Sequence, residues 1–351
     1  MQQIPAPIAG GLVLSFATSQ LLLDQGRILG CSGIAHSTTE RLFSTFSTPA
    51  ADRKTTASNA GDQDWKIAAV LGIVAGGLAL GQLRSSLEVV VGQPIFDPVA
   101  SGVLRPLVAG LAVGAGTKLA RGCTSGHMLI GMARFSKRSF AATLTFFPVA
   151  IATARYFAYP LPATTSSTLA YLDLHRATPS LAALFLLPLA TSLLVHRILP
   201  PRVAALTQSF SLSFLFSLGL ALTGMLRPSK VLSFFYIPIS TSFATSAYRL
   251  PSWDFSLALV AIGGLIPNIF AWRAMKDRKT PRNRDKWDVP TGGRVDRALI
   301  FGSALFGLGW GLMGICPGPM LAVLGSGTGG VALSLFAGAF AAGGFVVNAL
   351  T

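Results

Sequence analysis

The chain has 351 residues, of which 51% are hydrophobic and only 12% are charged, whereas charged residues make up about a quarter of soluble domains. This balance argues against one large soluble core and favours a protein that lies in a lipid bilayer, with no separate soluble domain. The formal net charge of +15 does not indicate a nucleic-acid partner, because the basic residues lie in the gaps between apolar runs.

Apolar runs of roughly 20 residues, each long enough to cross a bilayer, recur along the chain. The first has no basic leading region, since residues 1–7 contain neither Lys nor Arg, so it is predicted as a span and not as a secretory signal. Residues 37–65 are rich in Ser, Thr and Ala and are predicted to be a mobile polar loop. The pattern predicts an all-α polytopic membrane protein of about nine spans, at residues 6–23, 67–83, 103–120, 139–158, 181–199, 206–226, 254–272, 297–314 and 328–350.

Lys and Arg in short loops favour the cytoplasmic side of a membrane and therefore test this number of spans. The connections after the first, third, fifth and seventh spans hold 18 of the 28 basic residues, and the opposite connections hold 5. We interpret this asymmetry as nine crossings with both termini outside and the basic loop at 273–294 inside. Residues 231–248 are an exception, because they are apolar enough to dip into the membrane and would invert the later orientation if they crossed it.

Two weak internal matches indicate a duplication. GTKLARGCTSGHML around Cys123 matches GWGLMGICPGPML around Cys316 at an offset of 193 residues. The segment around Gly33 matches the segment around Gly224 at an offset of 191 residues. Two matches at nearly the same offset predict that the two halves of the chain share one ancestral fold.

This offset corresponds to five spans, and an odd number of spans reverses the orientation of the second copy. The chain is therefore predicted to contain two inverted, pseudo-symmetric repeats, at residues 6–160 and 206–351, joined by a linking helix at 181–199. Such repeats commonly hold the substrate near the membrane midplane, at helices that are interrupted in corresponding positions.

Every cysteine lies beside Gly or Pro at the end of an apolar run: Cys31 in RILGCSG, Cys123 in RGCTSGH and Cys316 in GICPGP. This pattern predicts broken helices, which are tolerated at membrane depth where they are buried in protein or line a cavity. The free N–H groups of a half-helix N-terminus bind anions, and glycine permits close approach of the backbone. The candidate backbone residues at the breaks are Gly30, Gly33, Gly122, Gly126, Gly314, Pro317 and Gly318.

A protonated thiol meets a soft sulfur atom without presenting negative charge, because S–H is a weak donor and sulfur is polarisable. Several such weak contacts in series allow a sulfur-containing anion both to enter and to leave. The alternative is that each cysteine is merely a small buried apolar residue, but the position of all three at glycine-rich breaks favours a function. No CxxC pair occurs, so neither a disulfide framework nor a structural zinc site is predicted.

Polar residues beside the breaks complete the candidate site. Thr124 and Ser125 would coordinate oxygens of the anion, with helix capping as the alternative. His127 would donate a hydrogen bond or move protons, unless it caps a helix at the interface. A vestibule that attracts a dianion would contain Arg27, Lys118 and Arg121, which are equally well explained as ordinary cytoplasmic-side basic residues.

The remaining glycine patterns have a structural explanation, and the common catalytic motifs are absent from the sequence. Glycines four residues apart are predicted to pack helices against one another, at Gly72/Gly76, Gly77/Gly81 and Gly110/Gly114. No serine-hydrolase, phosphate-loop or zinc-protease motif occurs, and no buried acidic relay stands out. We therefore predict neither an enzyme nor a proton-coupled pump, and expect no cofactor and no metal.

Three segments of the chain resemble the YeeE/YedE sulfur-transport family of thiosulfate permeases: residues 121–127 (RGCTSGH), 307–319 (GLGWGLMGICPGP) and 219–235 (GLALTGMLRPSKVLSFF). The resemblance spans nearly the full length and implies an hourglass-shaped, pseudo-symmetric helical protein, which we expect in the plasma membrane. It also implies that the three cysteines lie near the constriction and relay thiosulfate through S–H to sulfur hydrogen bonds. The long polar loop after Cys31 and the irregular motif around it depart from the family pattern.

Two other functions are compatible with the sequence. A membrane-embedded sulfur-transfer protein would form a persulfide on a cysteine and pass the sulfur to a soluble acceptor, but this needs an activated thiolate, which apolar surroundings disfavour. A structural scaffold would tolerate replacement of all three cysteines. For a transporter, the expected partners are the thiosulfate ion, the lipid bilayer and a soluble sulfur-carrier protein on the cytoplasmic side.

Overall fold

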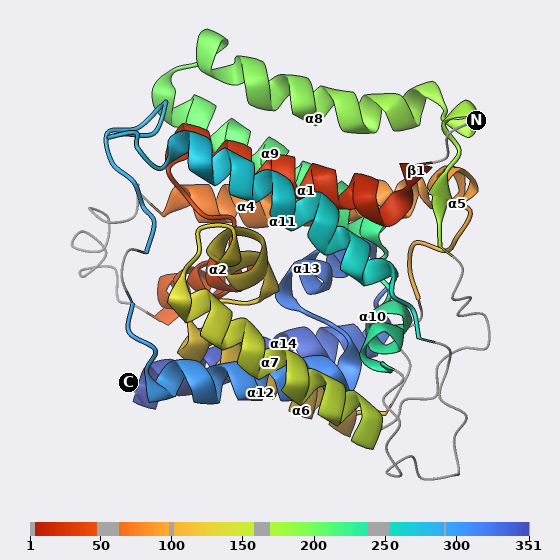
Figure 1. Ribbon diagram of the computed structural model, residues 1–351, viewed down its shortest axis with the longest axis vertical. Helices are drawn as coiled ribbons and strands as arrows, with labels where there is room; N and C mark the ends of the chain where they lie inside the picture. The colour runs from red at the N-terminus through yellow and green to blue at the C-terminus, as the bar shows by residue number, and fades with distance from the viewer. Residues whose placement is uncertain are drawn as a thin grey trace.

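The computed structural model describes residues 4–47, 63–97, 102–157, 169–237, 253–290 and 293–350, which fold almost entirely into helices (Figure 1). The first half contains α1 (Ala6–Gln25), α2 (Cys31–Ser47), α4 (Asp64–Gln82), α5 (Arg84–Val91), α6 (Leu104–Ala120), the π-helix η2 (Ser125–Met132) and α7 (Lys137–Tyr156). The 3-10 helix η3 (Leu174–Arg176) and α8 (Pro179–Ile198) follow. The second half contains α9 (Pro201–Thr223), α10 (Pro228–Phe235), α11 (Ser256–Met275), α12 (Arg297–Met313), α13 (Pro317–Ser326) and α14 (Gly330–Leu350). Two short strands, β1 (Ile4–Pro5) and β2 (Tyr171–Leu172), pair antiparallel.

Each of the nine predicted spans corresponds to one long helix, namely α1, α4, α6, α7, α8, α9, α11, α12 and α14. Within the described ranges, seven helical stretches are long and apolar enough to cross a membrane, one of them being α12 together with α13. The two others are α6, which has 17 residues, and α7, which includes Lys137, Arg138 and Arg155. The protein is therefore an all-α polytopic membrane protein, as its composition predicts.

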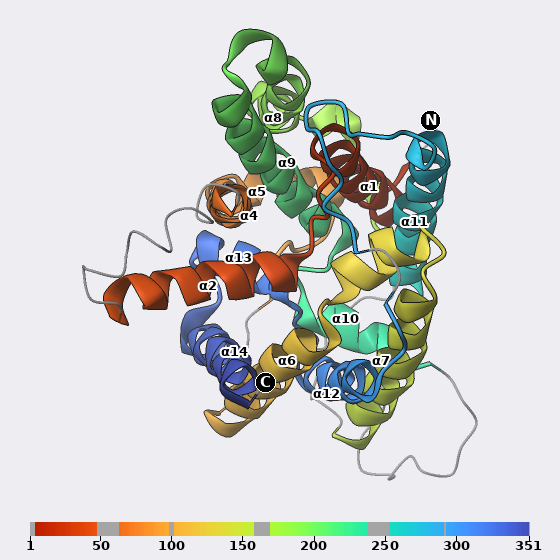
Figure 2. The ribbon, with the colours of Figure 1, turned by 90° about the vertical axis from the view of Figure 1, so that its left-hand side faces the viewer.

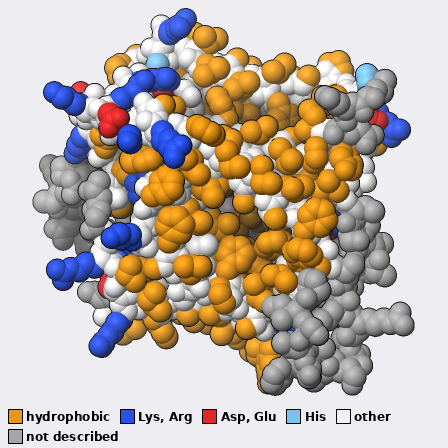
Figure 3. All heavy atoms as spheres, viewed as in Figure 1, with side chains coloured by type: hydrophobic (Ala, Val, Ile, Leu, Met, Phe, Trp, Pro, Cys, Tyr) orange, Lys and Arg blue, Asp and Glu red, His pale blue; other side chains and the backbone are white. Residues whose placement is uncertain are grey.

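Large apolar side chains cover the outward faces of the long helices. Leu144 on α7 is 73% exposed, Leu187 on α8 is 69% exposed and Phe301 on α12 is 64% exposed. Figure 3 shows apolar side chains across the middle of one face, with Lys and Arg gathered toward one edge. An apolar surface of this extent would be unfavourable in water and is suited to contact with lipid.

The two ends of the chain lie on opposite sides of the molecule, which corrects the predicted orientation. Ile4 pairs with Leu172 at one end of the helices, whereas Asn348, near the C-terminus, donates a hydrogen bond to Glu40 at the other end. Figure 1 shows the N- and C-termini on opposite sides. The prediction of both termini outside is wrong. Nine crossings are an odd number, so they place the two ends of the chain on opposite sides of the membrane.

The predicted polar loop at 37–65 is partly wrong, because α2 continues to Ser47 and therefore includes residues 37–47. Its polar side chains are stabilised by neighbouring helices: Glu40 pairs with Lys118 of α6, a contact that holds this stretch of α2 in place. Residues 48–62 lie outside the described residues, and α4 already begins at Asp64.

The apolar segment at 231–248 begins as the short helix α10, which has 8 residues. At about 1.5 Å of rise per residue, this helix is roughly 12 Å long, which is less than half the thickness of a bilayer core. The described part of the segment therefore does not cross a membrane, and residues 238–252 lie outside the described residues.

The long helices form two layers with short helices between them (Figures 1 and 2). One layer contains α1, α4, α9 and α11, and α8 packs on its outer side against α9. The other layer contains α6, α7, α12 and α14. The short helices α2, η2, α10 and α13 each contact helices of both layers. The space between the layers is thus built from the segments that follow the predicted breaks.

The packing partners of the first half recur in the second half. In the first layer, the contact between α1 and α11 corresponds to the contact between α9 and α4. In the second layer, the contact between α6 and α14 corresponds to the contact between α12 and α7. The short helices follow the same rule, because α2 contacts α14 as α10 contacts α7, and α4 contacts α13 as α11 contacts η2. These contacts match α1 with α9, α4 with α11, α6 with α12 and α7 with α14.

The paired glycines hold these helices close together. A Cβ added at Gly77 would overlap the carbonyl oxygen of Ala322 on α13, and one at Gly110 or Gly114 would overlap a carbonyl oxygen on α14. Gly72 makes the same close approach to α9, at the carbonyl oxygen of Phe210. The predicted packing role of the glycine pairs is confirmed, because no larger side chain fits at these crossings.

Candidate functional site

Four long helices end in the same way. The residue after each helix adopts the left-handed conformation, namely Gly26 after α1 (φ 65°), Arg121 after α6 (φ 57°), Gly224 after α9 (φ 76°) and Gly314 after α12 (φ 67°). Three are glycines, which have no Cβ to clash there. Beyond each cap the chain starts one of the short helices α2, η2, α10 and α13. The broken helices predicted from the sequence are therefore present, and the fourth, at α9 and α10, contains no cysteine.

The cysteines lie where the other three short helices begin. Cys31 is the first residue of α2, Cys123 lies two residues before η2, and Cys316 is the N-terminal cap of α13. Their side chains are 1%, 1% and 4% exposed, respectively. All three line one cavity of about 270 Å³, whose walls come from helices of both layers. Residues that are far apart in the sequence thus meet at a single cavity.

Two hydroxyl groups connect the cysteines to one another. The Oγ of Ser125 accepts a hydrogen bond from the backbone N–H of Cys31 at 3.0 Å and lies 3.3 Å from the Sγ of Cys123. The Oγ1 of Thr124 donates to the Sγ of Cys316 at 3.7 Å. Both hydroxyls also line the cavity, so they are placed to contact an occupant together with the thiols.

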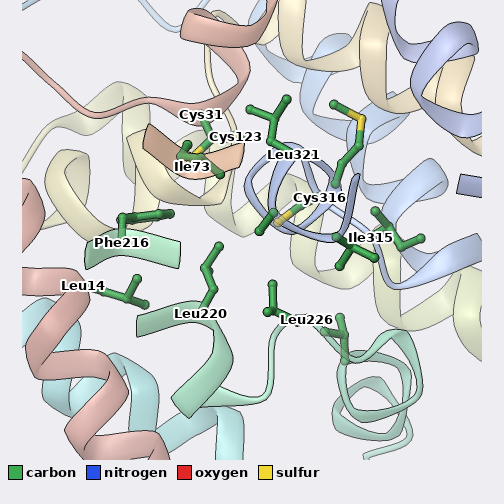
Figure 4. Close-up of a cluster of buried hydrophobic side chains, with 14 of the residues drawn as sticks. Leu14, Cys31, Ile73, Cys123, Phe216, Leu220, Leu226, Ile315, Cys316 and Leu321 are labelled. Atoms are coloured by element: carbon green, nitrogen blue, oxygen red, sulfur yellow. The ribbon is translucent and has the colours of Figure 1, made fainter. Parts of the chain in front are cut away.

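The rest of the cavity wall is apolar and was not anticipated from the sequence. Figure 4 shows the three cysteines among Leu14, Phe216 and Leu220, within one buried cluster of side chains. Aromatic and thioether groups contribute much of the remaining wall, from Met128, Phe147, Met225, Phe234 and Trp310. Periodicity identifies such residues only as buried, because the cavity they surround is formed by helices that are distant in sequence.

The predicted glycine and proline residues fall into two groups. Gly318 faces the site, since a Cβ added there would lie 3.1 Å from the Sγ of Cys31. Open space borders Gly30, Gly33 and Gly126, where an added Cβ would meet no atom within 4 Å. Gly122 packs on His127, and Gly314 and Pro317 shape the turn and first residue of α13. Close approach of these backbones to a substrate stays a prediction.

Two predicted side chains do not reach the cavity of the three cysteines. His127 is 7% exposed, and its ring nitrogens lie 3.2 Å from the Oγ of Ser139 and 3.3 Å from the carbonyl oxygen of Ala120. It therefore fastens the ends of α6 and α7 together, as the capping alternative proposed. Arg27 is 6% exposed, donates to Gln25 at 2.9 Å and stacks over Trp65. Its burial in these contacts removes it from the predicted vestibule.

A second cavity, of about 440 Å³, lies where Lys118 and Arg121 were predicted to form a vestibule. Both of these residues line it, together with Gly33, His36 and Asp296. Lys118 is paired with Glu40. Partial burial acts to raise the pKa of Glu40, but hydrogen bonds from Lys118 and Asn348 outweigh it and hold that pKa below its usual value. The cavity therefore combines the positive charges of Lys118 and Arg121 with the carboxylate of Asp296.

Helix α2 contributes lining residues to both cavities. Its first residue, Cys31, lines the apolar cavity, whereas Gly33 and His36, one turn further along, line the polar cavity. Among the described residues, no group of three or more His, Cys, Asp and Glu side chains is placed to hold a metal ion. The arrangement offers neutral donors in an apolar chamber, with a charged chamber beside it.

In comparisons with known proteins, each half of the chain matches a family model. Residues 3–153 match a family model described as sulphur transport, and residues 204–351 match a family of unknown function, DUF6691. The boundary between the two matches contains α8. No solved structure gives a significant match.

Curated relatives from Xylella fastidiosa are described as probable transporters. One from strain Temecula1 is 38% identical over 138 residues, which is 39% of this chain and 84% of the relative. A second from the same strain is 35% identical over 150 residues, which is 43% of this chain and 92% of the relative. A protein from strain 9a5c is 38% identical over 138 residues, or 85% of its length. Each of these relatives is therefore shorter than half of this chain.

Proposed function

Because the chain belongs to the YeeE/YedE sulfur-transport family, we propose that it carries thiosulfate across the membrane through the cavity lined by its three cysteines. The observation that carries this proposal is the convergence of Cys31, Cys123 and Cys316, from three separate helix breaks, on one apolar cavity. The chain has no other cysteine. Every thiol of the protein thus faces the same space.

The chemistry of the cavity suits a soft dianion better than a hard one. Each protonated thiol is a weak donor with a polarisable sulfur atom, so it attracts the terminal sulfur of thiosulfate without repelling its charge. Thr124 and Ser125 add hydroxyl groups for the sulfonate oxygens. The volume of about 270 Å³ is far above the roughly 10–15 Å³ that one water molecule needs. Weak contacts in series let the ion move on from each site.

The relation between the two halves supports an inverted-repeat transporter. The helix contacts of the first half recur in the second, and four helices end in the same left-handed cap. Five spans separate the matched helices, so the two copies run in opposite directions. Two inverted repeats, at 6–160 and 206–351, would place the three thiols at their interface, near the membrane midplane. The half-length relatives are consistent with each half being an independent unit.

The polar cavity supplies the inner end of the route. Lys118 and Arg121 line it on the side of the basic loop, which the distribution of charge assigns to the cytoplasm. A dianion that passes Cys31 would next meet these residues. In this account thiosulfate moves inward across the plasma membrane and is then taken up by a soluble sulfur carrier.

Uptake of labelled thiosulfate into proteoliposomes tests this function. Each of Cys31→Ala, Cys123→Ala and Cys316→Ala removes one hydrogen bond to a charged ligand, so each is expected to lower uptake about 10- to 100-fold. Ser303→Ala is the matched control, because this buried serine of α12 does not line the cavity. Its uptake should equal that of the wild type.

Two results would contradict the proposal. Uptake that survives all three cysteine substitutions would remove the thiols from the route. A persulfide detected by mass spectrometry after exposure to thiosulfate, without net uptake, would instead favour sulfur transfer to a soluble acceptor.

A further inference from the structure

Trp310 lines the apolar cavity and has a buried hydrogen-bond donor without a partner among the described residues. The residue lies on α12, one turn before the left-handed cap at Gly314, and lines the cavity together with the three cysteines. It is 3% exposed, and its indole N–H has no hydrogen-bond partner among the described residues. A buried donor without a partner loses its hydrogen bond to water and gains nothing in return, so it needs an explanation.

Four phenylalanine rings fix the indole in place. Phe235 meets it edge-on, with ring centroids 4.7 Å apart, and Phe306 stacks on it at 5.6 Å. Phe146 and Phe147 contact it edge-on at 5.9 and 5.6 Å. Because rings from α7, α10 and α12 surround it, the indole has little freedom to turn its N–H toward another protein group.

Packing alone does not account for tryptophan at this position. A phenylalanine would make the same kinds of ring contact without burying an N–H group. Two other tryptophans satisfy theirs: Trp253 donates to the carbonyl oxygen of Phe234 at 3.1 Å, and Trp287 donates to that of Arg278 at 3.2 Å. Trp310 thus lines the cavity and, unlike these two tryptophans, has an indole N–H without a partner among the described residues.

Donors of this kind are scarce around the cavity. Pro317 and Pro319 have no N–H, so among the first three residues of α13 only Gly318 has one. The hydroxyls of Ser125 and Thr124 also line the cavity, but each has a single proton and also contacts a cysteine sulfur, so these two donors are shared between the thiols and an anion. An oxyanion that enters this apolar space would therefore depend strongly on any additional fixed donor, because hydrogen bonds to charged groups are strongest where water is excluded.

We infer that the indole N–H of Trp310 donates a hydrogen bond to an oxygen of the transported sulfur oxyanion, and that this contact selects sulfur anions with oxygen atoms over those without. The inference rests on the proposed transport function and adds a second recognition element to it. The thiols recognise the soft sulfur end of the ion, and Trp310 recognises its oxygen end. An ion that has only one of these ends satisfies only part of the site.

The test compares Trp310→Phe with Trp287→Phe in proteoliposomes. Trp310→Phe keeps an aromatic ring but removes the N–H, so thiosulfate uptake at low concentration is expected to fall at least tenfold. Its melting temperature should equal or exceed that of the wild type, because burying an N–H group without a partner destabilises the fold and the substitution removes that group. Trp287→Phe removes an indole N–H in the basic loop, far from the cavity, and should leave uptake unchanged.

Competition assays test the selectivity itself. Thiocyanate has a sulfur end but no oxygen, so its inhibition constant against labelled thiosulfate should stay within twofold in Trp310→Phe. The inhibition constant of sulfite, which has oxygens, should rise at least tenfold. A change of the same size for both anions would overturn the inference, because it would indicate general damage to the cavity.

A second variant tests the inference even if the Trp310→Phe protein does not fold. Benzothienylalanine at position 310 has the shape of tryptophan with sulfur in place of the N–H, and it should reproduce the loss of thiosulfate uptake. Normal uptake in this variant would overturn the role of Trp310, while the cysteine variants would still test the transport function. Absence of thiosulfate uptake by the wild type would instead contradict the proposed function itself.

Discussion

At the scale of single residues, Ser125 is the group that joins two of the thiols. Its Oγ accepts a hydrogen bond from the backbone N–H of Cys31 and lies 3.3 Å from the Sγ of Cys123. In Ser125→Ala the first N–H of α2 loses its partner, as in the loss of a helix cap, so we expect the protein to be less stable by about 1–2 kcal/mol. Thiosulfate uptake should also fall several-fold, because both thiols lose their common neighbour. Thermal unfolding in detergent and proteoliposome uptake measure the two effects.

Ser326→Ala provides the comparison for Ser125→Ala. The Ser326 hydroxyl bonds only near the C-terminal end of α13, to Val323 and Thr328. Its removal should leave uptake unchanged. Equal uptake by the two variants would show that Ser125 does not organise the site.

The cysteines of the site could be predicted from the sequence, together with Thr124, Ser125 and Gly318, whereas its apolar and aromatic wall could not. Cys31, Cys123 and Cys316 stand out because each follows a glycine-rich interruption of an apolar run. The amino-acid sequence does not reveal that the N–H of Trp310 lacks a partner, since this depends on which rings surround the indole in the folded protein. His127 in RGCTSGH was a candidate with helix capping as the alternative, and its ring nitrogens lie within hydrogen-bond distance of Ser139 and Ala120.

At the scale of elements, α10 differs from the other three short helices because charges replace the cysteine. Arg227 pairs with Asp97 at 3.0 Å, and Lys230 lies 3.6 Å from Asp254. Arg227, Lys230 and Asp254 are no more than 5% exposed. Asp97 also accepts hydrogen bonds from Ser229 at the first turn of α10. These pairs hold α10 against the segments around it.

Asp97→Asn tests the contribution of this pairing. Removing one partner of a buried ion pair leaves the other charge uncompensated, so the unfolding free energy should fall by about 3–5 kcal/mol. Asp173→Asn is the control, because Asp173 and Arg176 form an exposed pair whose loss costs at most about 1 kcal/mol. Melting temperatures in detergent measure both variants, and similar melting of the two would contradict a structural role for the α10 charges.

The long helices could be predicted because each carries enough apolar residues in one continuous run. The short ones were harder, since α10 and α13 have 8 and 10 residues and owe their stability to burial between the layers. The extension of α2 through residues 37–47 was missed for a related reason. Its polar residues look like a loop in the sequence but find partners on α4 and α6.

At the scale of the whole molecule, hydropathy predicts the membrane class but not the cavity between the two layers of helices. The two layers meet across the short helices, and the cavity of the three cysteines lies where helices from both layers converge. The orientation illustrates the same limit. The count of basic residues predicts which loops are cytoplasmic, but nine crossings, an odd number, place the two ends of the chain on opposite sides.

Anomalous diffraction from crystals grown with selenosulfate tests most directly whether the ion passes among the thiols. Selenosulfate is thiosulfate with selenium in place of its terminal sulfur, so the selenium marks the soft end of the ion. We predict a selenium peak inside the cavity, in van der Waals contact with the Sγ of Cys31, Cys123 or Cys316 and with the sulfonate oxygens toward Trp310. An ion bound only outside that cavity, in a protein that transports selenosulfate, would contradict the account.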